Sequence, residues 1–165
     1  MVAQICGLGT VEIDTETTGL NDMRADLVGI SLCVEAGTAC YIPLTHKDAG
    51  SNDLFGSDSL AEGQLGLDDV LAVLKPLLED PAVLKIGQNM KYDAKILARY
   101  GVTIAPIEDT MLLSYALHAG LHGHGMDALS ERYLNHTPIL IKPLLGSGKS
   151  AITFDRVPID DAVPY

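Results

Sequence analysis

The stretch Val11–Leu20 reads VEIDTETTGL and places two acids at the end of an apolar run. Asp14 and Glu16 are two positions apart, so on a β-strand their side chains project from the same face. Two like charges this close destabilise a bare strand end, whereas oxygen ligands directed at one point suit Mg²⁺ or Mn²⁺. The stretch therefore predicts a strand that ends at a metal site. The alternative is a strand that ends in two solvated acids.

A second acidic stretch, Gly87–Asp93, reads GQNMKYD. It follows the short apolar run 83–86 and opens a helical pattern that continues to Tyr100. Asn89 and Asp93 are four positions apart and would share one helix face. A helix that begins just after a strand brings its first turn to the carboxyl edge of the sheet, where open α/β sheets carry their sites. Asp93 is therefore a candidate third metal ligand, or else a first-turn acid that stabilises the helix dipole.

The remaining pattern predicts an α/β fold with a mixed sheet, because three consecutive strands are followed by alternating helices and strands. Apolar residues recur with helical spacing between Leu67 and Leu78. The stretch from Asp48 to Gly66 is rich in Gly, Ser and Asp and is predicted to be a loop. The predicted strands are 10–14, 27–34, 38–43, 83–86 and a short one at 102–104, and the other predicted helices are 110–119 and 127–135. Residues 138–154 show no clear period.

The length of 165 residues suits a single domain, 1–165. The N-terminus lacks the basic region and long apolar core of a signal peptide, and no apolar stretch approaches the roughly 20 residues of a membrane span. We therefore expect a cytoplasmic, monomeric protein. Cys6, Cys33 and Cys40 show no metal-binding spacing and are expected to be buried, reduced thiols.

The formal net charge of −11 argues against a general duplex-binding surface, because nonspecific DNA affinity comes mainly from Lys and Arg. It does not exclude a nuclease. An enzyme that grips a few nucleotides of a single-stranded end can rely on bound metal ions and on stacking.

At these residues the chain resembles the proofreading 3′–5′ exonuclease domain of bacterial DNA polymerase I, in the tyrosine branch of the DEDD superfamily. The likeness runs from about Gly9 to the last residue. It includes the stretches 27–31, 39–44, 74–78, 109–115 and 126–134. The resemblance implies a ribonuclease H-like fold and an enzyme that hydrolyses the 3′-terminal phosphodiester of single-stranded DNA. Its implied partners are a single-stranded DNA 3′ end and the remainder of a polymerase chain.

The resemblance also assigns roles to individual residues. Asp14, Glu16 and Asp93 match the family's first three metal-binding carboxylates, which would hold two divalent ions, Mg²⁺ or Mn²⁺. The positions that match those lining the path of the single-stranded 3′ end are Thr17, Leu20, Gln88, Asn89, Lys91 and Tyr92.

The C-terminal stretch Asp160–Tyr165 resembles the start of the family's third motif, in which a Tyr is followed four residues later by an Asp. The family uses this tyrosine to hold the attacking water, which makes Tyr165 a fourth catalytic candidate. The fourth carboxylate is not among these residues. We therefore expect an exonuclease domain cut within its third motif, folded but catalytically impaired.

Two other patterns in the sequence suggest alternative functional sites. Gly146–Ser150 reads GSGKS but lacks the first glycine of a phosphate-binding loop, since that position is Pro143. His122 and Asp127 have the spacing used in the histidine branch of the same superfamily, yet His122 lies in a glycine-rich connector and Asp127 stands where an N-cap would start a helix. A zinc site from His118, His122 and His124 is the least favoured interpretation.

Two alternatives to a polymerase proofreading domain stay open. One is a stand-alone RNA-trimming exonuclease of the ribonuclease D type, which shares the carboxylate chemistry. The other is a non-catalytic module that uses this fold only for nucleic-acid or protein contacts.

Overall fold

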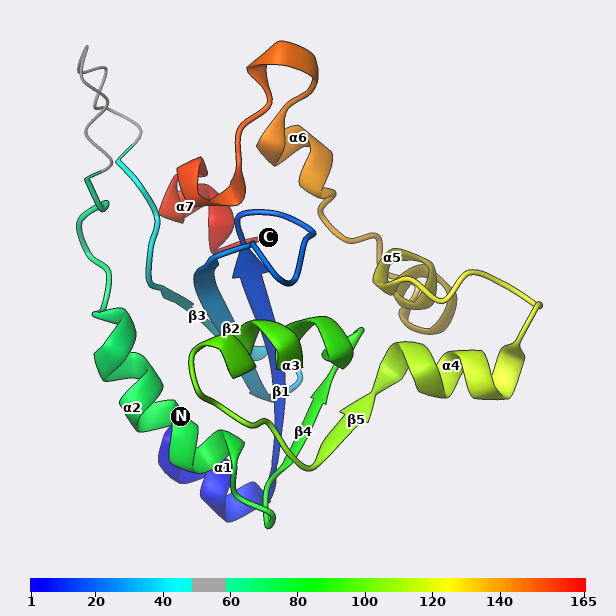
Figure 1. The fold of residues 1–165 in the computed structure, drawn as a ribbon. Coiled ribbons are helices and arrows are strands. Elements are labelled where there is room, and N and C mark those ends of the chain that lie inside the picture. Colours follow the sequence, from blue (N-terminus) through cyan, green and yellow to red (C-terminus); the bar gives the residue numbers. More distant parts are fainter. Residues whose placement is uncertain (49–58) are drawn as a thin grey trace.

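A five-stranded mixed sheet forms the centre of the computed structural model, which describes residues 1–48 and 59–165 (Figure 1). The strands are β1 (Thr10–Thr17), β2 (Leu27–Glu35), β3 (Thr38–Pro43), β4 (Leu84–Gly87) and β5 (Ile107–Asp109), in the spatial order β3-β2-β1-β4-β5. The first three pair antiparallel, whereas β1, β4 and β5 run parallel. The predicted meander followed by βα units is confirmed.

The central strand β1 has two chemically different faces because its side chains alternate. Val11, Ile13 and Thr15 are buried in the main core. The opposite face carries the acids of the same strand, starting at Glu12 and continuing with Asp14 and Glu16. One strand thus serves the hydrophobic core on one side and collects negative charge on the other.

Three helices surround the apolar side of the sheet: α1 (Val2–Leu8), α2 (Leu67–Leu78) and α3 (Met90–Arg99). Their apolar residues join the strands in one cluster, which includes Ile5, Leu74 and Ile96. The helix α2 has the boundaries expected from its sequence and buries residues at the predicted spacing.

The turn from β4 into α3 is very close to β1. A Cβ atom on Gly87 would lie 2.7 Å from the Ile13 carbonyl oxygen and 2.3 Å from Met90 Sδ, so only glycine fits there. Asn89 has a φ of 60° and forms the N-cap of α3. The prediction that Asn89 shares a helical face with Asp93 is therefore wrong, because the helix begins at Met90.

The C-terminal half is built from short helices. They are α4 (Thr110–His118), α5 (Met126–Leu129), a π-helix (Ser130–Leu134), α6 (Ile141–Leu145), two 3₁₀ helices (Gly148–Ser150 and Phe154–Arg156) and α7 (Ile159–Ala162). The helices predicted at 110–119 and 127–135 are thus present, and the irregular stretch 138–154 contains α6. A small second core joins Val28 to Phe154, Val157 and Ala162.

The short strand predicted at 102–104 is wrong, since the fifth strand is β5. Val102 and Ile104 are buried, which explains their apolar character. Their segment does not pair with a strand, because its amides turn to the neighbouring helices. The Val102 amide donates to the Leu97 carbonyl and the Thr103 amide to Glu79 Oε1.

Three smaller predictions also have outcomes. Most of the predicted loop 48–66, namely residues 49–58, lies outside the described residues; in the rest, Lys47 and Leu60 form an isolated bridge. The cysteines are free thiols as expected, but Cys6 is exposed and the other two are half-buried. Gly146–Ser150 does not connect a strand to a helix.

Among the described residues, no helix has the length and apolar character needed to cross a membrane.

Candidate active site

The position of Asp93 is set by the open edge of β1. The neighbouring strand β4 pairs with β1 only from Thr10 to Glu12. Beyond that point Asp93 Oδ1 takes the place of a strand partner, accepting hydrogen bonds from the Thr15 amide at 3.1 Å and from Thr15 Oγ1 at 2.5 Å. The side chain of Asp93 is 2% exposed. A carboxylate from α3 is thereby fixed against the strand that carries the other acids.

A second aspartate holds the turn that leads into α3. Asp109 Oδ1 accepts from the Asn89 amide at 3.1 Å and from the Met111 amide at 2.9 Å. The same oxygen caps α4, whose first turn also includes the Leu112 amide at 3.3 Å. Asp109 thus connects the ends of β4 and β5, and it adds negative charge near Asp93.

The acids on and beside β1 form one electrostatic cluster. Burial raises the pKa of Asp14 to about 8, and the nearby charges of Asp93, Glu16 and Glu12 add to the shift. Burial and Asp93 raise the pKa of Glu16 to about 7. The pKa of Glu12 is raised for the same two reasons. Buried carboxylates that repel one another are stabilised by a shared cation.

The carboxylates of this cluster are chemically suited to bind a divalent ion, because all their donor atoms are negatively charged oxygens. Within residues 1–48 and 59–165, however, no three His, Cys, Asp or Glu side chains are arranged so that they could hold one metal ion. Asp93 Oδ1 already accepts two hydrogen bonds from Thr15. The structure therefore brings the three predicted ligands into one cluster without forming a coordination shell.

Tyr165 lies next to this cluster, as Figure 1 shows for the C-terminus and the end of β1. Burial raises the pKa of its phenol to about 12, and the charges of Glu16, Asp14 and Asp127 contribute. The hydroxyl therefore keeps its proton at neutral pH. It can donate and accept hydrogen bonds but is a poor base.

The loop after β1 is tied to α3 and presents Leu20. The Tyr92 hydroxyl is 2.6 Å from Thr17 Oγ1 and 2.5 Å from the Gly19 carbonyl oxygen. Further along the helix, Lys95 pairs with Asp22 at 2.6 Å. Leu20 itself is 97% exposed, so a role in core packing is excluded.

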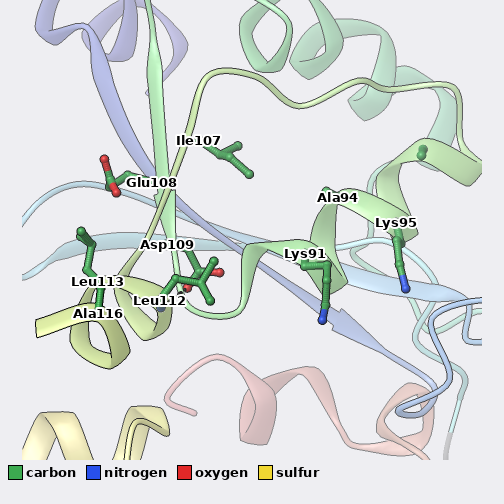
Figure 2. A pocket seen from close by; sticks show the side chains of 10 residues that line it. Lys91, Ala94, Lys95, Ile107, Glu108, Asp109, Leu112, Leu113 and Ala116 are labelled. Atoms are coloured by element: carbon green, nitrogen blue, oxygen red, sulfur yellow. Dashed lines mark hydrogen bonds between the residues drawn. The ribbon is translucent and has the colours of Figure 1, made fainter. Parts of the chain in front are cut away.

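The other predicted DNA contacts are more dispersed. Gln88 donates to the His124 carbonyl at 2.8 Å and accepts from Thr110 Oγ1 at 2.5 Å, so its amide supports the connector between α4 and α5. Lys91 is exposed and lines a groove of about 610 Å³ between α3, β5 and α4 (Figure 2). Figure 2 shows Lys91 and Lys95 on one side of this groove and Leu112 on the other. Asp93 is not among its lining residues.

Three histidines lie close together around the connector between α4 and α5. His122 packs against His118 and His124, with ring centroids 5.5 and 5.0 Å apart, and its Nδ1 lies 2.8 Å from the Gly123 carbonyl oxygen. The absence of a metal-holding group of three among the described residues applies to these histidines as it does to the acids of β1. The predicted N-cap at Asp127 is wrong, because α5 begins after Gly125 and Asp127 lies in its first turn.

Sequence reasoning missed several residues of this region. Glu12 could have been found by extending the alternation of Asp14 and Glu16 backwards by two positions. Asp109 precedes a predicted helix and has the side chain of an N-cap. The partnership of Thr15 with Asp93 had no local signal, since the two residues are 78 positions apart.

Comparison with known proteins identifies the family. Residues 1–165 match the sequence model of a 3′–5′ exonuclease family. The chain belongs to this family. The chain is 49% identical to DNA polymerase I of Rhizobium leguminosarum in a match that covers 99% of the chain. It is 41% identical to DNA polymerase I of Pseudomonas aeruginosa in a match that covers 94% of the chain. The chain spans only 17% and 16% of the length of these two relatives.

Solved structures of exonucleases share the fold of this family member. Escherichia coli RNase D, an exoribonuclease involved in structured RNA processing, is 18% identical, with a TM-score of 0.61 over 99% of this chain and 38% of its own. Brucella melitensis NrnC with bound Mg²⁺ is 23% identical, with a TM-score of 0.59 over 89% of this chain and 60% of its own. The predicted ribonuclease H-like fold is confirmed, and identities this low establish the fold alone.

The acidic cluster predicts an unusual pH dependence of stability for the metal-free protein. The pKa values of Asp14 and Glu16 are higher in the folded chain than the ordinary values of 3.8 and 4.5. The folded chain therefore holds these protons more tightly than the unfolded chain does. The free energy of unfolding is highest with respect to these two groups below about pH 4, and it falls as the pH rises to about 8. We expect Asp14→Asn to remove a large part of this decline, several kcal/mol between pH 4 and pH 8, since each pKa unit corresponds to about 1.4 kcal/mol.

Urea unfolding in EDTA at both pH values measures this difference. Asp160→Asn is the matched control, because Asp160 is an exposed acid on α7. An unfolding free energy that falls equally steeply in the parent and in Asp14→Asn would contradict the cluster.

Proposed function

We propose that this chain is a metal-dependent 3′–5′ exonuclease that hydrolyses the terminal phosphodiester of single-stranded DNA, as the proofreading part of a DNA polymerase I. The observation that carries the proposal is the cluster of Asp14, Glu16 and Asp93 at the end of β1, in a chain of the 3′–5′ exonuclease family. The two similar polymerases favour DNA as the substrate.

Each residue has a defined part in this proposal. Asp14, Glu16 and Asp93 would hold two divalent ions, and Thr15 orients Asp93 through the two hydrogen bonds described above. Such ions activate water and stabilise the charge on a scissile phosphate when they are bound. The neutral phenol of Tyr165 would orient the attacking water. The loop that carries Leu20 would separate the terminal base from its neighbour.

The decisive experiment separates the charge of Asp93 from its structural bonds. Asp93→Asn retains an acceptor for Thr15 but loses the negative charge, so the fold should survive and digestion of a 5′-labelled single strand should fall by at least about 100-fold. Asp160→Asn is the control of the same chemical change on the surface. The assay compares Mg²⁺, Mn²⁺ and EDTA, and the expected product is nucleoside monophosphate.

Four results would redirect the proposal. Digestion that is equal in EDTA would exclude a metal-dependent reaction. A single-stranded RNA that is degraded faster than DNA of the same sequence would favour the ribonuclease D type. Unchanged digestion by Asp93→Asn would exclude Asp93 from the reaction, and absence of digestion even by a chain extended beyond Tyr165 would favour a binding module.

We further propose that the chain alone is slower than a longer version of it. Only three of the family's four carboxylates can be assigned within these 165 residues. When several catalytic groups act as one unit, the loss of one of them commonly lowers the reaction rate by several orders of magnitude. Extending the chain with the dozen residues that follow the matched region in the Rhizobium polymerase should raise the digestion rate, whereas equal rates would show that the three acids suffice.

Leu20 provides a test of the DNA path. The side chain is almost fully exposed, so Leu20→Ala should leave the melting temperature unchanged. If Leu20 wedges against a base, the loss of about 1 kcal/mol of contact should lower kcat/KM for single-stranded DNA by about 5-fold. Met23→Ala is the control, because Met23 is 70% exposed on the same loop. Equal effects of the two substitutions would remove the special role of Leu20.

A further inference from the structure

A group of buried and partly buried polar side chains attaches the C-terminal segment to the sheet, and the proposed reaction does not use it. His46 is 0% exposed. Its Nδ1 lies 2.9 Å from the Val157 carbonyl oxygen, and its Nε2 lies 2.6 Å from the Tyr41 hydroxyl. A carbonyl oxygen only accepts, so Nδ1 carries the hydrogen and donates it. Burial lowers the pKa of His46, which favours the neutral ring and leaves Nε2 to accept from Tyr41.

The next residue along the chain holds the same segment. The Lys47 amide donates to the Asp155 carbonyl at 2.7 Å, and Lys47 Nζ is 3.2 Å from Asp155 Oδ2. Asp155 is 3% exposed, and its Oδ1 accepts no hydrogen bond from the described residues. An unpaired charge at such a depth would be costly, so the ion pair with Lys47 is needed. We refer to Tyr41, His46, Lys47 and Asp155 as the polar latch.

Apolar contacts continue from the latch to Tyr165. The Phe154 ring packs between His46 and Tyr165, with centroids 5.9 and 5.8 Å away. The Tyr165 amide donates to the Ala162 carbonyl at 3.2 Å, and Ala162 belongs to the small second core. A continuous series of contacts thus leads from the end of β3 to the phenol beside the acids.

The latch also touches the strands beside the acids. Glu16 pairs with Gly29 across β1 and β2. A Cβ atom on Gly29 would lie 2.1 Å from the Tyr41 hydroxyl oxygen, so the absence of a side chain there lets Tyr41 lie against β2. Tyr41 therefore reaches His46 from a position close to Glu16.

We propose that the polar latch is a positioning element, which fixes residues 154–157 and thereby holds the Tyr165 phenol beside Asp14 and Glu16. His46 is its central residue, because it bonds to Val157 on one side and to Tyr41 on the other. The catalytic consequence rests on the proposed function, since only there does Tyr165 orient the attacking water.

The test uses the 165-residue chain, which contains no Trp. Tyr165→Trp introduces a single fluorophore at the position to be measured. In this background His46→Asn keeps a donor at the place of Nδ1, whereas His46→Gln keeps an acceptor at the place of Nε2 and loses the donor to Val157. We expect acrylamide quenching to stay near the parent value in His46→Asn and to rise by about twofold or more in His46→Gln.

Lys85→Met in the same background controls for general loss of stability. Lys85 is fully buried away from the latch, and its Nζ donates to the Asp80 and Val83 carbonyls at 2.9 and 2.7 Å. It should lower the melting temperature without raising quenching. If His46→Gln does not fold, Lys47→Met replaces it, with the same expected rise. Equal quenching in the parent and the latch variant, or a rise in Lys85→Met as large as the rise in His46→Gln, would overturn the proposal.

Kinetics in the Tyr165 chain form the second measurement. His46→Gln should lower kcat for single-stranded DNA by about tenfold while KM changes by less than about twofold, and His46→Asn should restore kcat. Adding His46→Gln to Tyr165→Phe should cost less than it does alone, because both act through the phenol. Full additivity would contradict the latch. Absence of digestion by both this chain and the extended chain would refute the proposed function, and the quenching result would still decide the positioning role.

Discussion

The two hydrogen bonds from Thr15 to Asp93 are the interaction on which the rest of the site depends. They join a helix to a strand edge that β4 leaves open, and they replace a backbone partner with a carboxylate. The same helix then fixes the loop after β1, through Tyr92 at its first turn and Lys95 one turn later. The acids and the loop that carries Leu20 therefore keep their relative positions, because both are attached to α3.

This arrangement has an energetic cost that the fold offsets elsewhere. Gathering Glu12, Asp14 and Glu16 on one face of β1 raises their pKa values, and each raised value means that the ionised form is disfavoured in the folded chain. The other face of the same strand is buried in the main core, where Val11 and Ile13 are at most 1% exposed. Apolar burial on one side thus stabilises a strand whose other side repels itself.

Much of the fold could be predicted from sequence, because periodicity reports local geometry. The antiparallel strands, α2 and α3 are near their expected boundaries, and the acids stand where alternation placed them. The errors arose where a distant partner decides the outcome. Residues 102–104 are apolar because they enter the core, yet their amides bond to α2 and α3. Likewise, no local pattern reveals that the amide of Gln88 bonds to His124 and Thr110.

The two hydrophobic cores also differ in how far they depend on individual long-range contacts. The main core draws on α1, α2, α3 and most of the sheet, so no single contact controls it. The second core has four buried residues, Val28, Phe154, Val157 and Ala162. Burial of so few side chains gives only a few kcal/mol before the entropy of ordering the segment is subtracted. The C-terminal segment therefore needs directional polar contacts to keep one position, and the buried His46 and the partly exposed Lys47 supply them. The placement of Tyr165 then depends on contacts such as the hydrogen bond between His46 and Val157. These two residues are 111 positions apart in sequence, so local sequence patterns do not reveal their contact.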